Sequence, residues 1–153
     1  MQPILQTLPL SMSRLSLLVD LSSLLGREVD LDALLASACE RMREALRSDR
    51  ATIWLVDSER GDLVTRLADL PELPELRQPL DRGIAGWVAR SGETVRVGDA
   101  TQDERFDPSA DRVTGYTTRS MLVAPIREHA RAPVRGVVQL LNREGGPFVA
   151  EDE

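Results

Sequence analysis

Residues 83–120 decide the fold, because they hold three characteristic segments: GIAGWVA at 83–89, GDA at 98–100 and TGYTTRS at 114–120. The apolar run of the first segment lies between two glycines and predicts a short helix over 84–90. The residues at 94–97 predict a short strand. Asp107 followed by Pro108 is typical of a helix start, so a second short helix is expected over 108–114. Together these elements form a helical crossover that carries one short strand.

Two helices and a hairpin are expected before this crossover. Leucines spaced three, four and seven residues apart predict an amphipathic helix over 10–25, and a second apolar stripe predicts a helix over 31–48. The run ATIWLV at 51–56 is rich in strand formers, and a polar turn leads to a partner strand at 63–67. Three prolines and three acids predict an irregular loop over 69–80.

Two more strands and the start of a helix are expected after it. The strands fall at 118–126 and 134–141, and a glycine-rich turn at 144–147 follows. Residues 151–153 are acidic, which suits the first turn of a helix because negative charge favours that end of the dipole. We therefore expect a fragment of a longer chain that stops as this helix begins. The whole pattern predicts helices packed on a mostly antiparallel sheet, the α+β class.

Composition excludes several classes of function. The length of 153 residues predicts one globular domain, and a net charge of −6 argues against a nucleic-acid surface, which needs clustered positive charge. With one cysteine, Cys39, and one histidine, His129, the chain lacks the ligands for a zinc site and the partners for a disulfide framework. No apolar run reaches the roughly 20 residues that cross a bilayer. We expect a cytoplasmic domain with no metal and no membrane or nucleic-acid partner.

Catalysis has little support in the sequence. His129 falls in an expected turn and Cys39 on an expected helix, so neither a Ser-His-Asp nor a Cys-His set is available. No glycine-rich phosphate loop precedes a helix. We therefore expect a domain without enzymatic activity of its own.

The three segments quoted above resemble those of GAF domains, most of all the ligand-binding GAF domains of cyclic-nucleotide phosphodiesterases and adenylyl cyclases. A further family signature is matched by Asn142, Arg143, Phe148 and Asp152, with arginine in place of lysine. The resemblance covers residues 15–153 and leaves residues 1–14 as an N-terminal leader. It implies a six-stranded antiparallel sheet, with N- and C-terminal helices on one face and a pocket on the other face under short helices and loops. It also implies a homodimer paired through the terminal helices.

The same resemblance implies a set of ligand-binding residues: Thr52, Asp69, Ile84, Ala85, Asp111, Thr114, Thr118 and Gln139. The implied ligands are cyclic AMP and cyclic GMP, and no cofactor is required. Two positions depart from the cyclic-nucleotide binders. Ala68 stands where a ring stacks on the base, and Gln139 stands where the family has a glutamate.

Each of these positions also has an ordinary structural explanation. Asp111, Thr114 and Thr118 suit helix capping and turns as well as ligand contacts, and Asp69 suits the turn into a proline-rich loop. Gln139 suits a pairing inside the cavity. The backbone N–H groups at the start of the helix over 108–114 would serve a phosphate.

Aromatic residues make up only 3% of the chain, which limits how a purine ring is stacked. Because side chains alternate along a strand, Trp54 shares a face with Thr52. Trp54 therefore offers the ligand a ring if that face lines the pocket. A lone tryptophan in a central strand is more often core, and we favour that interpretation.

We expect a regulatory domain of a bacterial-type signalling protein, which senses a small molecule and passes the signal to an output domain in the same longer chain. An ion pair between Arg143 and Asp152 would tie the last strand to the C-terminal helix. The alternatives are a ligand-free dimerisation and interaction module, whose pocket is filled by its own side chains, and a sensor of another small metabolite. An empty cavity lined by Thr52, Asp111 and Thr118 would favour sensing.

Overall fold

The computed structural model describes residues 12, 14–17, 19, 31–65 and 75–153. The described residues between 12 and 19 are helical. The other elements, in chain order, are α2 (Leu31–Leu46), β1 (Ser48–Asp57), β2 (Asp62–Thr65), β3 (Leu76–Pro79), α3 (Gly83–Ser91), β4 (Val95–Val97), η3 (Ala100–Gln102), α4 (Ser109–Thr114), β5 (Met121–Ile126), β6 (Gly136–Arg143) and η4 (Ala150–Asp152).

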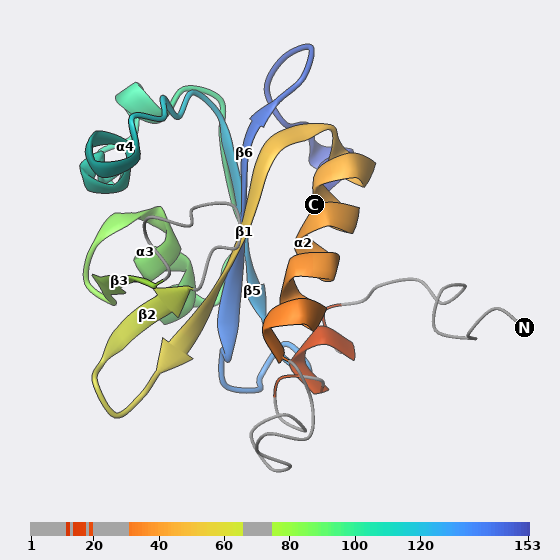
Figure 1. Cartoon of the computed structure of the whole chain (residues 1–153), viewed down its shortest axis with the longest axis vertical. Coiled ribbons are helices and arrows are strands. Elements are labelled where there is room, and N and C mark those ends of the chain that lie inside the picture. The colour runs from red at the N-terminus through yellow and green to blue at the C-terminus, as the bar shows by residue number, and fades with distance from the viewer. Residues whose placement is uncertain (1–11, 13, 18, 20–30, 66–74) are drawn as a thin grey trace, which may run out of the picture.

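The strands form one antiparallel six-stranded sheet in the order β3-β2-β1-β6-β5-β4 (Figure 1). The central pair is β1 and β6, which are the first and last strands along the described chain. Their register places Thr52 opposite Gln139 and Trp54 opposite Val137. The six-stranded antiparallel sheet implied by the resemblance is therefore confirmed.

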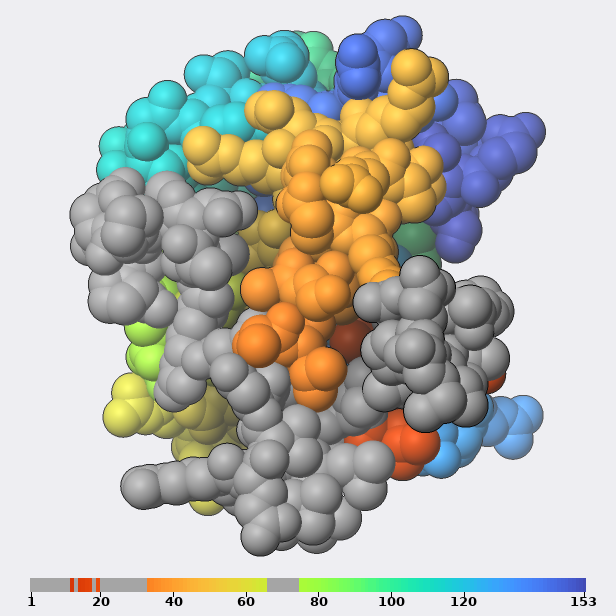
Figure 2. All heavy atoms as spheres, turned by 45° about the vertical axis from the view of Figure 1, so that its right-hand side comes forward, coloured from red at the N-terminus to blue at the C-terminus, as the bar shows by residue number. Residues whose placement is uncertain are grey.

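Helix α2 covers one face of this sheet, and it runs across the middle of the view in Figure 2. Its inner side chains pack on strand residues in a cluster of Leu15, Ala38, Ile53, Ile126 and Val138. The C-terminal residues lie on the same side, where Phe148 packs with Leu122 and Leu140. Residues from both ends of the chain therefore share the face that α2 covers.

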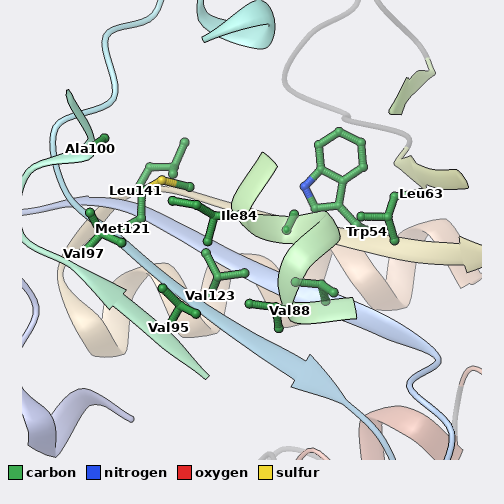
Figure 3. Packing of buried hydrophobic residues seen from close by; sticks show 12 residues of the cluster. Trp54, Leu63, Ile84, Val88, Val95, Val97, Ala100, Met121, Val123 and Leu141 are labelled. Atoms are coloured by element: carbon green, nitrogen blue, oxygen red, sulfur yellow. The ribbon is translucent and has the colours of Figure 1, made fainter. Parts of the chain in front are cut away.

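The opposite face carries the larger core, and α3 lies over it (Figure 3). Ile84 and Val88 are four residues apart, so they share one side of the helix and meet Trp54, Val123 and Val137 of the sheet. Each fully buried aliphatic side chain contributes about 1.5–3 kcal/mol to the free energy of unfolding. This packing fixes the start of α3 against the centre of the sheet.

Glycine is required where β6 begins beside β1. A Cβ atom on Gly136 would lie 2.6 Å from the carbonyl oxygen of Trp54. The close approach of the two backbones leaves no room for a side chain there. Gly136 therefore sets where the central pair starts.

Strand β3 corrects the expectation of an irregular loop over 69–80, since its residues pair with β2. Arg77 of this strand forms ion pairs with Asp57 at 3.1 Å, Asp62 at 2.9 Å and Glu75 at 2.7 Å. Pro79 ends an edge strand, where a missing N–H costs no ladder hydrogen bond. Polar residues held by ion pairs produce no apolar alternation, so the pattern hides this strand.

Several element boundaries also differ from the expected ones. Helix α2 ends at Leu46, and Arg47 has a φ of 56°, so β1 begins at Ser48 instead of residue 51. Strand β5 begins at Met121 instead of residue 118, because the N–H groups of residues 118–120 donate to the side chains of Asp111 and Asn142 and not to the backbone of a neighbouring strand. Strand β6 covers 136–143 instead of 134–141. The expected helix over 10–25 and the leader over 1–14 fall mostly outside the described residues.

Candidate functional site

A cavity of about 630 Å³ is lined by residues from the α3 side of the sheet and by part of α2. Its walls come from β1, β2, β3 and β6, from the start of α3, and from the segment that begins at Phe106 and runs through α4 to Thr118. Met121 of β5 and residues of α2, among them Glu40 and Arg43, also line it. This volume falls within the range of small-molecule sites, about 300–1,000 Å³. The cavity has the size for a ligand such as a nucleotide.

The cavity brings together every implied ligand-binding residue that the structure describes: Thr52, Ile84, Ala85, Asp111, Thr114, Thr118 and Gln139. Asp69 lies outside the described residues, as does Ala68. The apolar part of the wall comes from Ile84 and Ala85 at the start of α3, which are both buried. Polar side chains come from the centre of the sheet and from the region of α4.

Thr52 and Gln139 form the polar floor of the cavity. They are direct partners in the β1–β6 ladder, and Val123 of β5 lies opposite Gln139 on the other side. Within the described part of the chain, neither polar side chain has an intramolecular hydrogen bond. A hydroxyl and an amide are therefore free to bond a ligand.

Trp54 is both core and cavity wall. Its side chain is 3% exposed and belongs to the cluster on the α3 face, as the stronger expectation held, and it also lines the cavity. Its Nε1 donor is buried without a hydrogen-bond partner among the described residues. A buried donor without a partner costs about 1–3 kcal/mol, so a ligand acceptor that reached it would gain by bonding it.

The side chains around α4 bond mainly to one another. The backbone N–H of Thr118 donates to Asp111 at 2.7 Å and its hydroxyl donates to the same carboxylate at 2.9 Å. The hydroxyl of Thr114 donates to the carbonyl oxygen of Ala110 at 2.9 Å. These bonds are the capping and turn contacts expected as the alternative to ligand binding, although the three residues still face the cavity.

The start of α4 is already occupied by a carboxylate. The hydroxyl of Ser109 and its backbone N–H, at 2.9 Å, donate to Asp107. These bonds hold the pKa of Asp107 below its usual range, the hydroxyl contributing most. The Asp107 carboxylate therefore occupies the backbone N–H of Ser109, the first residue of α4, and places a negative charge beside it. This charge disfavours the phosphate position that the sequence predicts at the start of this helix.

Sequence reasoning missed a cluster at the α4 end of the cavity. The Arg50 guanidinium stacks over the ring of Tyr116, 3.9 Å from its centroid, and both residues line the cavity. The Tyr116 hydroxyl donates to Asp49 at 2.7 Å and accepts from the Asn142 side chain at 2.9 Å. Burial of the ring and the bond to Asp49 raise the pKa of Tyr116 above its usual value. Strand alternation from Thr52 was the one signal for Arg50.

The family signature residues lie at the end of β6 and in the segment that follows it. Asn142 has a left-handed φ of 56°, and its side-chain oxygen accepts the N–H groups of Arg119 and Ser120 at 2.6 and 3.1 Å. The expected ion pair is present, with 3.3 Å between Arg143 Nε and Asp152 Oδ2. Phe148 is buried. Asn142 therefore braces the loop that carries Thr118, and the ion pair ties the end of β6 to η4.

Two features are absent from the described residues. No helix there is long and apolar enough to cross a bilayer. No group of three or more His, Cys, Asp and Glu side chains in the same part of the chain is arranged to hold a metal ion.

Comparison with known proteins gives a consistent family. Residues 30–153 match the model of the GAF domain. A probable 3',5'-cyclic phosphodiesterase of Caenorhabditis elegans, pde-5, is 34% identical over 137 residues, which cover 82% of this chain and 18% of that protein. The chain thus spans less than a fifth of the length of this relative.

Solved structures agree on the fold. The GAF domain of an Acinetobacter phosphoenolpyruvate-protein phosphotransferase matches with a TM-score of 0.66 at 20% identity, covering 95% of this chain and 85% of that one. Free methionine-R-sulfoxide reductase from Neisseria meningitidis matches with a TM-score of 0.61 at 23% identity, covering 95% and 83%. At such identities the likeness establishes the fold alone.

Proposed function

The chain belongs to the GAF domain family of regulatory small-molecule-sensing modules, and from that premise we propose that its cavity binds a cyclic nucleotide. The observation that carries the proposal is the cavity of about 630 Å³ lined by Thr52, Asp111 and Thr118. A module used only for dimerisation would fill this space with its own side chains. The open cavity therefore favours sensing over that alternative.

The floor of the cavity suits the edge of a purine base. Gln139 presents an acceptor and a donor side by side, which matches the adjacent donor and acceptor of adenine. A glutamate at this position would present acceptors alone and would suit the neighbouring donors of guanine. Thr52, directly across the ladder, adds a hydroxyl. We expect cyclic AMP to bind more tightly than cyclic GMP.

Isothermal titration calorimetry of the purified chain tests binding. Cyclic AMP and cyclic GMP are titrated separately, and Gln139→Glu is expected to move the preference toward cyclic GMP by about tenfold, the worth of one good hydrogen bond. The proposal is wrong if neither cyclic AMP nor cyclic GMP gives a heat of binding at saturating concentration and neither competes with the other for the chain.

Thr118→Ala tests the carried-over site against a neighbouring control. The variant removes a hydroxyl that faces the cavity and bonds Asp111. We expect cyclic AMP to bind about threefold to tenfold more weakly. Thr117→Ala, next along the chain, removes an exposed hydroxyl outside the cavity and should bind as the parent does. Equal affinities for the parent and the Thr118 variant would count against the site.

We also propose a homodimer formed through the helical face of the domain. Two large apolar side chains on this face are exposed, Leu17 at 52% and Leu34 at 37%. Sedimentation velocity should give a dimer for the parent and a shift toward monomer for Leu34→Glu. An unchanged sedimentation coefficient in the variant would place the dimer contact elsewhere, and a monomeric parent would remove this part of the proposal.

The remaining parts of the proposed role concern the longer protein. We propose that the domain is cytoplasmic and has no catalytic activity of its own. We also propose that it controls an output domain in the same longer chain, and the matched region's share of only 18% of the phosphodiesterase relative supports this. The ligand must prefer one arrangement of the helical face to do this, because equal affinity for two states shifts neither.

A further inference from the structure

We propose that Arg50 binds the anionic group of the ligand and that Tyr116 is the positioning residue that holds the guanidinium at the cavity. This inference rests on the proposed function and deepens it, because it states where the phosphate of a cyclic nucleotide is held. It is an alternative to the start of α4, where the Asp107 carboxylate accepts the N–H of Ser109.

The strand places Arg50 beside the ligand floor. Residues 50, 52 and 54 alternate onto the same face of β1, and Arg50 lines the cavity with the other two. Two strand residues span about 6.7 Å. A ligand whose base reaches Thr52 and Gln139 therefore has its phosphate end within reach of a long arginine side chain at residue 50.

Among the described residues, Arg50 is the cavity-lining arginine without an ion pair. Arg43 pairs with Glu40, and Arg77 pairs with three carboxylates including Glu75. No carboxylate in the described part of the chain lies within ion-pair distance of Arg50. The charge left for a ligand is therefore positive.

The cavity-lining carboxylates, in contrast, already have partners: Glu40 with Arg43, Glu75 with Arg77, Asp49 with Tyr116, Asp107 with Ser109, and Asp111 with Thr118. Each accepts at least one hydrogen bond in the ligand-free state. A cationic ligand would have to compete for them, whereas an anionic one meets an uncommitted guanidinium.

Tyr116 fixes where this guanidinium lies. Its ring is under Arg50 at 3.9 Å, and its hydroxyl is held from one side by Asp49 and from the other by Asn142. Stacking uses the face of a guanidinium and leaves its edge N–H groups free to bond two oxygens of a phosphate. The platform thus lowers the ordering cost of binding.

Calorimetry on the full chain tests the assignment with charged and uncharged probes. Arg50→Gln should weaken cyclic AMP and cyclic GMP by roughly 10- to 100-fold, the worth of a hydrogen bond between charged groups, and leave adenosine and guanosine within about twofold. The parent's affinity for the cyclic nucleotides should fall with added salt more steeply than that of the variant. Arg112→Gln removes the same charge from an exposed position outside the cavity and should change nothing.

Variants at the platform separate positioning from charge. Tyr116→Phe keeps the ring and should cost less affinity than Tyr116→Leu, which removes the surface under Arg50. Arg50→Lys keeps the charge, loses the flat stack, and should fall between the parent and Arg50→Gln. An order in which Tyr116→Phe is as weak as Tyr116→Leu would overturn the platform role.

The outcomes for the proposed function and for this inference are distinct. If the parent binds cyclic nucleotides and Arg50→Gln binds them equally well, or loses nucleosides in the same proportion, the assignment of Arg50 is wrong and the proposed function stands. If the parent binds neither nucleotide, inorganic phosphate is added while the side-chain Nε–H signal of Arg50, identified by its loss in Arg50→Gln, is followed by NMR. Movement of that signal supports the anion site, and a stationary signal overturns it.

Discussion

Asn142→Ala should be among the most damaging substitutions in the chain. The side-chain amide, at a residue 5% exposed, accepts the N–H groups of Arg119 and Ser120 and donates to Tyr116 and to the carbonyl of Thr117. Orphaning the two N–H groups costs about 1–2 kcal/mol each, and an alanine at a φ of 56° adds about 1 kcal/mol. We expect a loss of about 3–5 kcal/mol in the free energy of unfolding.

Urea denaturation followed by the fluorescence of Trp54 and Trp87 measures this loss. With a slope near 2 kcal/mol per molar, the midpoint should fall by roughly 1.5–2.5 M without a change in slope. Asn142→Gly removes the same bonds but accepts the left-handed backbone, so it should be about 1 kcal/mol more stable than the alanine variant. Asn142→Asp keeps both acceptor bonds and should be the mildest of the three.

The order of the three variants in free energy of unfolding tests which bonds of Asn142 matter. An alanine variant that loses under about 1 kcal/mol would mean that water satisfies the N–H groups as well as the amide does. An aspartate variant as unstable as alanine would mean that the donor bonds to Tyr116 and Thr117 dominate. If alanine abolishes folding, the glycine and aspartate variants still supply the comparison.

Three further outcomes follow from the contacts described above. Tyr116 is the single tyrosine, so the absorbance of its phenolate at high pH reports this residue alone. Because its pKa is raised in the folded state, its stabilising contribution should be complete below about pH 10 and be lost as the pH rises further. A phenolate titration with its midpoint at or below about pH 10 would contradict this. Gly136→Ala should lower the free energy of unfolding, measured by thermal denaturation, by about 1–3 kcal/mol. The control Gly98→Ala, whose Cβ would meet nothing closer than 3.9 Å, should leave it unchanged. Equal melting temperatures for the two variants would mean that β6 shifts to make room for the added methyl group. Asp152→Asn should cost about 0.5–1 kcal/mol through loss of the Arg143 ion pair, and a loss that does not shrink in high salt would point to another cause.

The local signals in the sequence predict most of the fold. The short helices α3 and α4 have clear starts and end before left-handed glycines, Gly92 and Gly115, so residue types alone indicate them. Strand β3 lacks such a signal because Arg77 and its acidic partners replace the apolar alternation. A strand such as β3, which ion pairs hold at the edge of the sheet, can be identified only after the strand that it pairs with is known.

The candidate site is predictable only in part, for a different reason. The resemblance to a family supplies Thr52 and Gln139, and strand alternation adds Trp54. Tyr116 and Asp49 are 67 residues apart and meet only in the folded chain. No spacing rule connects them, so the platform under Arg50 emerges from tertiary structure.

The position of β6 has a consequence for synthesis of the chain on the ribosome. Until Gly136–Arg143 has emerged, β1 and β5 have no common neighbour, and the sheet exists at most as two separate ribbons with open inner edges. Such edges are templates for pairing with other chains. A nascent domain halted before residue 136 should therefore be prone to aggregation, and the release of one final strand should complete the sheet and the cavity floor in a single late step.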